Sequence, residues 1–104
     1  MSDLNSILFE GTVADMSAYD PRTCTAIRLE VESTRHYKVN GEGKQLTETT
    51  MIPVEITGKA IAQAHSWVKK SVGIRVVGRV AYSDYLKGLY IVAEAVERKR
   101  HGAN

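Results

Sequence analysis

Apolar and polar residues alternate along two stretches of the chain, Thr25 to Arg35 and Thr49 to Thr57. Successive side chains of a β-strand point to opposite faces, so each stretch predicts a strand with one buried and one open face. The positions assigned to the buried face are Ile27, Leu29, Val31, Ile52, Val54 and Ile56. The open face of the second strand carries Met51, Pro53, Glu55 and Thr57, and is available to solvent or to a partner.

Three further strands and one helix are predicted from residue composition and spacing. Runs of β-forming residues predict strands at Ile7–Val13, Ile74–Tyr82 and Leu89–Val96. Apolar residues recur at helical spacing between Lys59 and Lys70, which predicts a helix with one apolar face. Trp67 is assigned to that face, and Tyr82 and Tyr90 to the core or a subunit interface.

Two predicted hairpins and the place of the helix define the expected fold. Asn40-Gly41 favours a protruding hairpin, because both central residues of a type I′ turn need positive φ. Ser83–Gly88 is expected to form a second hairpin loop. A single helix between the third and fourth of five strands is the connection of an oligonucleotide/oligosaccharide-binding (OB) barrel. The expected fold class is all-β: a five-stranded OB-fold Greek-key barrel with one helix between strands 3 and 4 and protruding β-hairpins.

Length and composition narrow the class of protein. The 104 residues suffice for one domain without disulfides or metals, with a basic tail at 98–104. The formal net charge is only +2, so a nucleic-acid role has to depend on local patches. The single cysteine, Cys24, excludes an internal disulfide and fits a reducing compartment. Neither a signal peptide nor an apolar run of about 20 residues is present, so a cytoplasmic protein without a membrane partner is expected.

Catalytic functions find little support in the sequence. His36, His65 and His101 fall in a hairpin, a helix and the tail, without metal-ligand spacing to Cys24 or to carboxylates. The chain has no glycine-rich phosphate loop and no arguable Ser-His-Asp set. We therefore expect a protein that is not an enzyme and that uses no metal or cofactor.

The order and spacing of these segments resemble the bacterial-type single-stranded DNA-binding (SSB) protein family, whose members are homotetramers. The resemblance runs from Asn5 to about Glu97, and is carried by Asn5-Ser6-Ile7-Leu8-Phe9-Glu10-Gly11 and by Gly58-Lys59, Lys69-Lys70 and Val76-Val77-Gly78-Arg79-Val80. It implies one single-stranded DNA-binding domain over residues 1–104. The implied function is non-catalytic, largely sequence-independent binding of single strands in DNA replication, recombination or repair, by a homo-oligomer.

The resemblance also implies which residues contact DNA. Tyr37 and Tyr85 match two of the family's base-stacking positions, while Met51 and Thr57 occupy the other two. Met51 can make a softer sulfur contact with a base, whereas Thr57 has no ring to stack on. The basic residues assigned to phosphates are Arg35, Lys38, Lys44, Lys59, Arg75, Arg79 and Lys87. Glu55 shares the face of Met51 and is expected to repel phosphates.

A second relative offers an alternative. The chain lacks the family's flexible tail with an acidic tip, and its length suits the primosomal replication protein N, a dimeric tail-less OB protein. That resemblance implies a protein-interaction and helicase-loading module with weaker single-strand binding and replication or primosome proteins as partners. A third possibility is an OB-fold RNA or tRNA binder, or a structural subunit that has lost nucleic-acid binding, which the missing aromatics and Glu55 favour. A tetramer favours the first interpretation and a dimer the second, and either protein would belong to a bacterial nucleoid or a mobile-element replicon.

Overall fold

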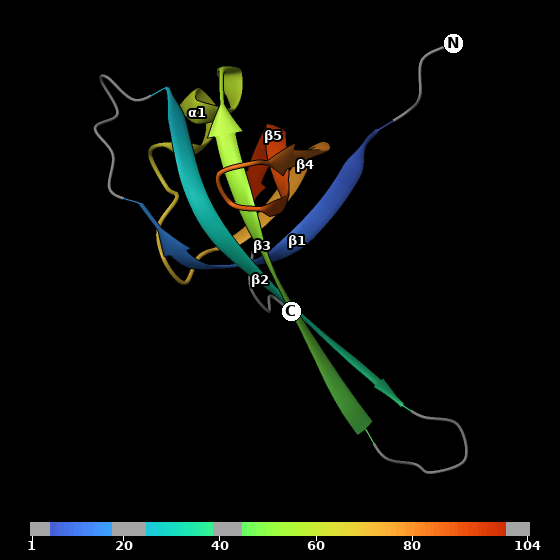
Figure 1. The fold of residues 1–104 in the computed structure, drawn as a ribbon. Coiled ribbons are helices and arrows are strands. Elements are labelled where there is room, and N and C mark those ends of the chain that lie inside the picture. The colour runs from blue at the N-terminus through green and yellow to red at the C-terminus, as the bar shows by residue number, and fades with distance from the viewer. Residues whose placement is uncertain (1–4, 18–24, 39–44, 100–104) are drawn as a thin grey trace.

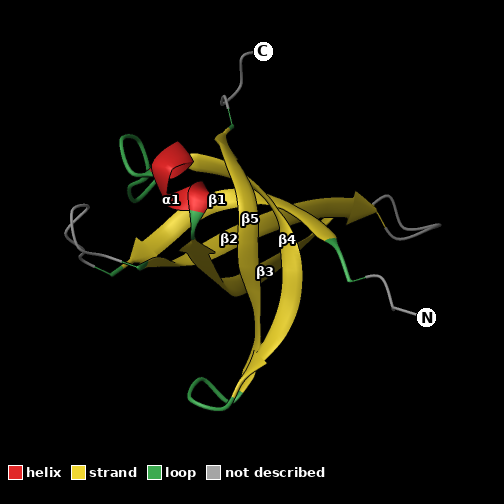
Figure 2. Cartoon of the chain, turned by 90° about the horizontal axis from the view of Figure 1, so that it is seen from above, coloured by secondary structure: helices red, strands yellow, loops and turns green. Residues whose placement is uncertain are grey.

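Five strands and one short helix form the chain in a computed structural model that describes residues 5–17, 25–38 and 45–99. The elements are β1 (Ile7–Met16), β2 (Ala26–Lys38), β3 (Gln45–Thr57), α1 (Lys59–Ala64), β4 (Gly73–Ser83) and β5 (Gly88–Arg98). The strands close into a barrel in the order β1-β2-β3-β5-β4, and Figure 2 shows this closed ring from above. The β3–β5 pair is parallel and the other pairs are antiparallel. The predicted all-β, OB-type barrel is confirmed.

The core is built from the positions that alternation assigned to it. Ile27, Leu29, Val31, Val54 and Ile56 are buried, and Ile52 packs partly buried against them. Residues from β1, β4 and β5 close the remaining sides, with Val13, Ile74, Val76 and Ile91 among them. Period-two alternation therefore identified the inward faces of β2 and β3 correctly.

The β2–β3 hairpin is longer than the sequence predicted. Its ladder runs without interruption from Ala26 opposite Thr57 to Lys38 opposite Gln45. Figure 1 shows its outer half extending as a narrow ribbon well beyond the barrel. The predicted turn at Asn40-Gly41 lies outside the described residues.

The predicted helix is too long. The observed helix α1 ends at Ala64, and Lys69-Lys70 follow a turn instead of extending the helix. The indole Nε1–H of Trp67 donates to the carbonyl oxygen of Gln63 at 2.6 Å, the acceptor that an i+4 backbone N–H would use in a continued helix. The Trp67 amide donates instead to the Ala64 carbonyl, three residues back, whereas the Val68 amide makes a helix-type bond to the same oxygen. Val68 is nevertheless buried, so the apolar spacing reflected burial without a continuous helix.

Tyr82 is not a core residue, because 62% of it is exposed. It shares the inward parity of Ile74 and Val76, but it pairs with Leu89 near the end of the β4–β5 hairpin, where both side chains are exposed.

Farther from the hairpin loop, the β4–β5 register shifts between Val77 and Gly78. A Cβ at Gly78 would overlap the carbonyl oxygen of Val92, so glycine is required where the strand bends.

Candidate functional site

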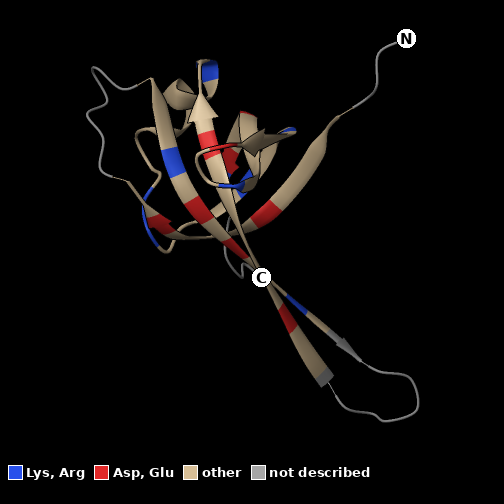
Figure 3. Cartoon of the chain, viewed as in Figure 1, with Lys and Arg blue, Asp and Glu red and all other residues tan. Residues whose placement is uncertain are grey.

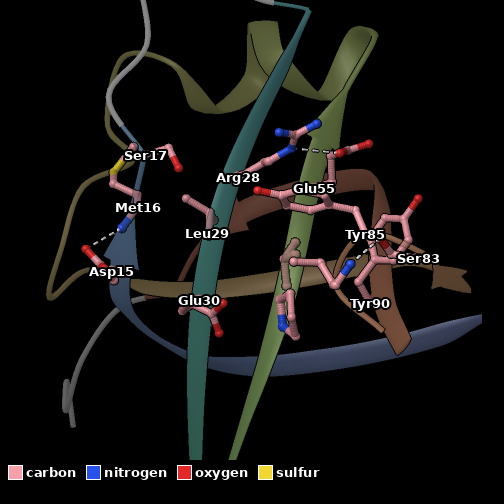
Figure 4. A pocket seen from close by; sticks show the side chains of 13 residues that line it. Asp15, Met16, Ser17, Arg28, Leu29, Glu30, Glu55, Ser83, Tyr85 and Tyr90 are labelled. Atoms are coloured by element: carbon pink, nitrogen blue, oxygen red, sulfur yellow. Dashed lines mark hydrogen bonds and ion pairs between the residues drawn. The ribbon is translucent and has the colours of Figure 1, made fainter. Parts of the chain in front are cut away.

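A groove of about 710 Å³ opens against the outer side of β2 and β3. Its lining comes from the end of β1 (Asp15, Met16, Ser17), from Arg28–Glu30 of β2, from Pro53–Glu55 of β3, and from Ser83, Tyr85, Leu86 and Tyr90 of the β4–β5 hairpin. Figure 4 shows these side chains around the groove, with the tyrosines on one flank and Asp15 and Met16 on the other. The two β-strands provide a rigid base, and the hairpin forms one wall.

The β4–β5 loop holds Tyr85 at this wall. The Ser83 hydroxyl accepts a hydrogen bond from the Leu86 amide at 3.0 Å, and the Ser83 carbonyl accepts one from the Lys87 amide at 2.8 Å. Lys87 adopts a left-handed φ of 57°, which turns the chain back into β5. The Tyr85 side chain extends toward the face of β2 and β3 (Figure 4), and the residue is 92% exposed. An anchored loop thus presents an aromatic ring whose faces are open to a ligand.

Arg28 and Glu55 form an ion pair between β2 and β3, the strands at the base of the groove. They are register partners on β2 and β3, and the Arg28 Nε donates to the Glu55 Oε2 at 3.1 Å. The Arg28 side chain is 72% exposed and the Glu55 side chain 24%. The carboxylate expected to repel phosphates therefore has a positive partner, and its repulsion is reduced accordingly.

Two further carboxylates line the groove. Asp15 accepts a hydrogen bond from the Met16 amide at 2.9 Å through one carboxylate oxygen. Glu30 is half-buried, and within the described parts of the chain its carboxylate has no hydrogen bond or ion pair. Along β2, Arg28 is followed by Glu30 and Glu32, and Figure 3 shows basic and then acidic colouring along this strand. Among the lining residues, three carboxylates face one guanidinium, so the groove is net acidic.

The structure brings few of the residues predicted from the sequence into this groove. Tyr85 lines it. Met51 lies on the open face of β3 opposite Glu32, half-exposed and beyond the groove's lining. Lys87 neighbours Tyr85 in the loop without lining the groove, and Lys59 begins α1.

The hairpin candidates lie in the extended ribbon. Arg35 is exposed on β2 opposite Glu48. Tyr37 and Lys38 occupy the last two positions of β2, but the structure does not describe their side chains, and Lys44 lies outside the described residues. Their roles remain predictions.

Arg75 belongs to an ion network on another part of the barrel. It is hydrogen-bonded to Glu10 of β1 and, at 2.9 Å, to Glu97 of β5, and Lys99 lies 3.5 Å from Glu10. The hydrogen bond from Arg75 lowers the pKa of Glu10, and the hydrogen bonds to Glu10 and then Glu97 raise the pKa of Arg75. This network ties β1, β4 and β5 together. Arg79 is exposed on β4 opposite Val92, and it does not line the groove either.

Sequence reasoning missed Arg28, Glu30 and Tyr90 as groove residues. By the same alternation, Arg28 and Glu30 fall on the open face of their strand, but no motif distinguishes them from other exposed charges. Tyr90 was assigned to the core or an interface, whereas it is half-buried at the groove wall. The open-face pattern could have identified Arg28 and Glu30 as groove residues only if the strand register had been known.

The barrel and its groove are those of the OB fold, and comparison with solved structures shows which OB proteins the fold resembles. No family model matches the sequence, and no curated protein sequence matches it significantly. The fold is similar to the single-stranded DNA-binding protein of Thermus aquaticus, with a TM-score of 0.71 and 20% identity over 95% of this chain. The chain spans only 52% of that protein's length.

Two smaller proteins match over nearly their whole length. The Plasmodium falciparum SSB, solved in complex with single-stranded DNA, has a TM-score of 0.71 at 10% identity, over 96% of this chain and 98% of its own. The small single-stranded DNA-binding protein of Streptomyces coelicolor has a TM-score of 0.69 at 16% identity, over 94% and 96%. The chain thus has the fold of SSB proteins, and the comparisons give no specific support to primosomal replication protein N. No helix in the described residues is long and apolar enough to cross a membrane.

Proposed function

We propose that this protein binds single-stranded DNA without catalysis, in DNA replication, recombination or repair. The observation that carries the proposal is the groove on the β2–β3 face of an OB barrel, where an anchored loop presents the open ring of Tyr85. OB folds bind oligonucleotides on this face, and stacking on an aromatic side chain tolerates any base. The likeness of the fold to three single-stranded DNA-binding proteins supports the same function.

In this proposal Tyr85 stacks a base, with Tyr90 beside it, and Arg28 meets a phosphate at the groove rim. Tyr37, Met51 and the basic residues of the β2–β3 hairpin extend the binding path along the ribbon. Stacking of one base is worth about 1–3 kcal/mol, which corresponds to a loss of about 5- to 150-fold in affinity on truncation of the ring.

The test is fluorescence anisotropy of a labelled mixed-sequence single strand against its duplex, over a salt series. The strand has about 20 nucleotides, more than the 4–16 that one OB fold covers. Wild type is expected to bind the single strand selectively, and Tyr85→Ala to weaken binding. Tyr82→Ala is the matched control, because Tyr82 is exposed on the same hairpin without lining the groove. Equal binding of duplex and single strand, or equal losses in both variants, would contradict the proposal.

A homo-oligomer, tetramer or dimer, is part of the proposal. Leu8 and Val77 are register partners on β1 and β4, and both are exposed. Exposed apolar residues that adjoin one another on a sheet are typical of surfaces that bind another chain. Sedimentation equilibrium measures the assembly directly, and a monomer at all concentrations would contradict this part.

A further inference from the structure

The charged side chains that line the groove are mostly hydrogen-bond acceptors, and this affects which bases the groove can bind. Its lining carboxylates are Asp15, Glu30 and Glu55, and its guanidinium, Arg28, is already paired with Glu55. Negative groups repel phosphates, so the sugar-phosphate backbone of a bound strand is kept to the rim, where the exposed Arg28 lies. The bases then face the groove.

Glu30 is the acceptor best placed to meet a base edge. On β2 it is opposite Pro53 of β3 and Asp15 of β1, and neither neighbour has a side-chain donor. Its half-buried carboxylate lines the groove without a partner among the described residues. An ionised carboxylate only accepts hydrogen bonds, so a ligand edge that donates satisfies it and an edge that accepts is repelled.

We infer that the groove prefers bases that present an amino group, cytosine above all among the pyrimidines, over thymine and uracil, and that Glu30 sets this preference. Cytosine carries an N4 amino group with one N–H that points away from its ring acceptors, a partner suited to carboxylates. Thymine and uracil carry an O4 acceptor there, and their one donor, N3–H, lies between two carbonyl oxygens that repel a carboxylate. The inference depends on the proposed single-strand binding and adds a preference for base composition to it. Because the groove is open, the effect falls at the low end of base-discrimination values, about fivefold in affinity.

The test compares oligo-dC with oligo-dU of equal length by anisotropy, at mildly alkaline pH where cytosine is unprotonated. Homopolymers present the same base at every position, so the unknown register of the strand does not matter. The two strands have identical phosphates, so the electrostatic contribution largely cancels, and any difference in their stacking is the same for wild type and for the variants. Wild type is expected to bind oligo-dC about fivefold more tightly.

Glu30→Gln is expected to abolish the difference, because an amide can donate to O4 as well as accept from N4. The matched control is Glu94→Gln, which makes the same charge change at an exposed glutamate of β5 outside the groove. It should keep the preference. Equal affinities in wild type, or a preference that survives Glu30→Gln, would overturn the inference while single-strand binding stands. Failure to bind any single strand would overturn the proposed function with it.

Discussion

The Arg28–Glu55 ion pair determines how much positive charge the groove can offer to a phosphate. Replacing Glu55 with glutamine removes the carboxylate 3.1 Å from the Arg28 Nε and keeps the shape of the side chain. Two effects then favour binding: Arg28 no longer has to leave an anionic partner, and a phosphate at the rim no longer meets Glu55. We expect Glu55→Gln to tighten single-strand binding.

The magnitude follows from exposure. Unit charges 4 Å apart interact by about 1 kcal/mol in water, and exposed ion pairs are typically worth about 0.2–1 kcal/mol. Arg28 is 72% exposed, so its pair with Glu55 belongs to this weak class. Adding the relief of repulsion, of similar size, gives a gain of about 0.4–2 kcal/mol, or about two- to thirtyfold in affinity.

The assay is a double-mutant cycle by anisotropy on a mixed-sequence single strand, with Glu55→Gln, Arg28→Ala and the double variant over a salt series. If Arg28 gains a phosphate contact, the slope of log affinity against log salt steepens by about 0.7 in Glu55→Gln. The gain should shrink when Arg28 is absent. Glu94→Gln controls for net charge, since this glutamate lies outside the groove. An equal gain in Glu94→Gln, or an undiminished gain without Arg28, would refute the reasoning.

Three further outcomes are expected. Tyr85→Leu should weaken single-strand binding nearly as much as Tyr85→Ala, by about 1–3 kcal/mol, because leucine cannot stack on a base; anisotropy measures both, and full binding by the leucine variant would exclude stacking. Gly78→Ala should destabilise the fold, since its Cβ would overlap the carbonyl oxygen of Val92, and urea denaturation showing an unchanged midpoint would contradict the close approach. The pKa of Glu10 is lowered from 4.5 by the Arg75 hydrogen bond, so its ionised form stabilises the folded state above about that pH, and the contribution is lost as pH falls through the lowered pKa. The stability advantage of wild type over Glu10→Gln should therefore be present at neutral pH and disappear once the pH falls below the lowered pKa, and an advantage that grows in acid would show the sign to be wrong.

Local patterns predicted what depends on local geometry. The faces of β2 and β3 follow from the two-residue repeat of a strand, so Val31, Val54 and Ile56 were placed correctly in the core. The predicted end of the helix was wrong because apolar spacing continues through Trp67 and Val68, which pack against the core, whereas the helix ends at Ala64 and the Trp67 indole occupies the Gln63 carbonyl. The core assignment of Tyr82 was wrong, because parity gives the face of a strand but not how far the barrel extends along it; its alternative assignment to a subunit interface stays a prediction.

The chemistry of the groove depends on the register of the β2–β3 hairpin. A two-residue turn at Asn40-Gly41, continued as a regular ladder, would place Arg28 opposite Pro53. The observed ladder places it opposite Glu55, two residues further along β3. A shift by two leaves every side chain on its predicted face, so the core assignment holds for either register. It changes the cross-strand partner of each charged residue, however. In the register of the two-residue turn, Arg28 would face Pro53 and its guanidinium would be open to a phosphate. In the observed register Arg28 is paired with Glu55, and Glu30 is the group without a partner among the described residues. The proposed binding face could therefore be predicted from the sequence, whereas its electrostatics required the register.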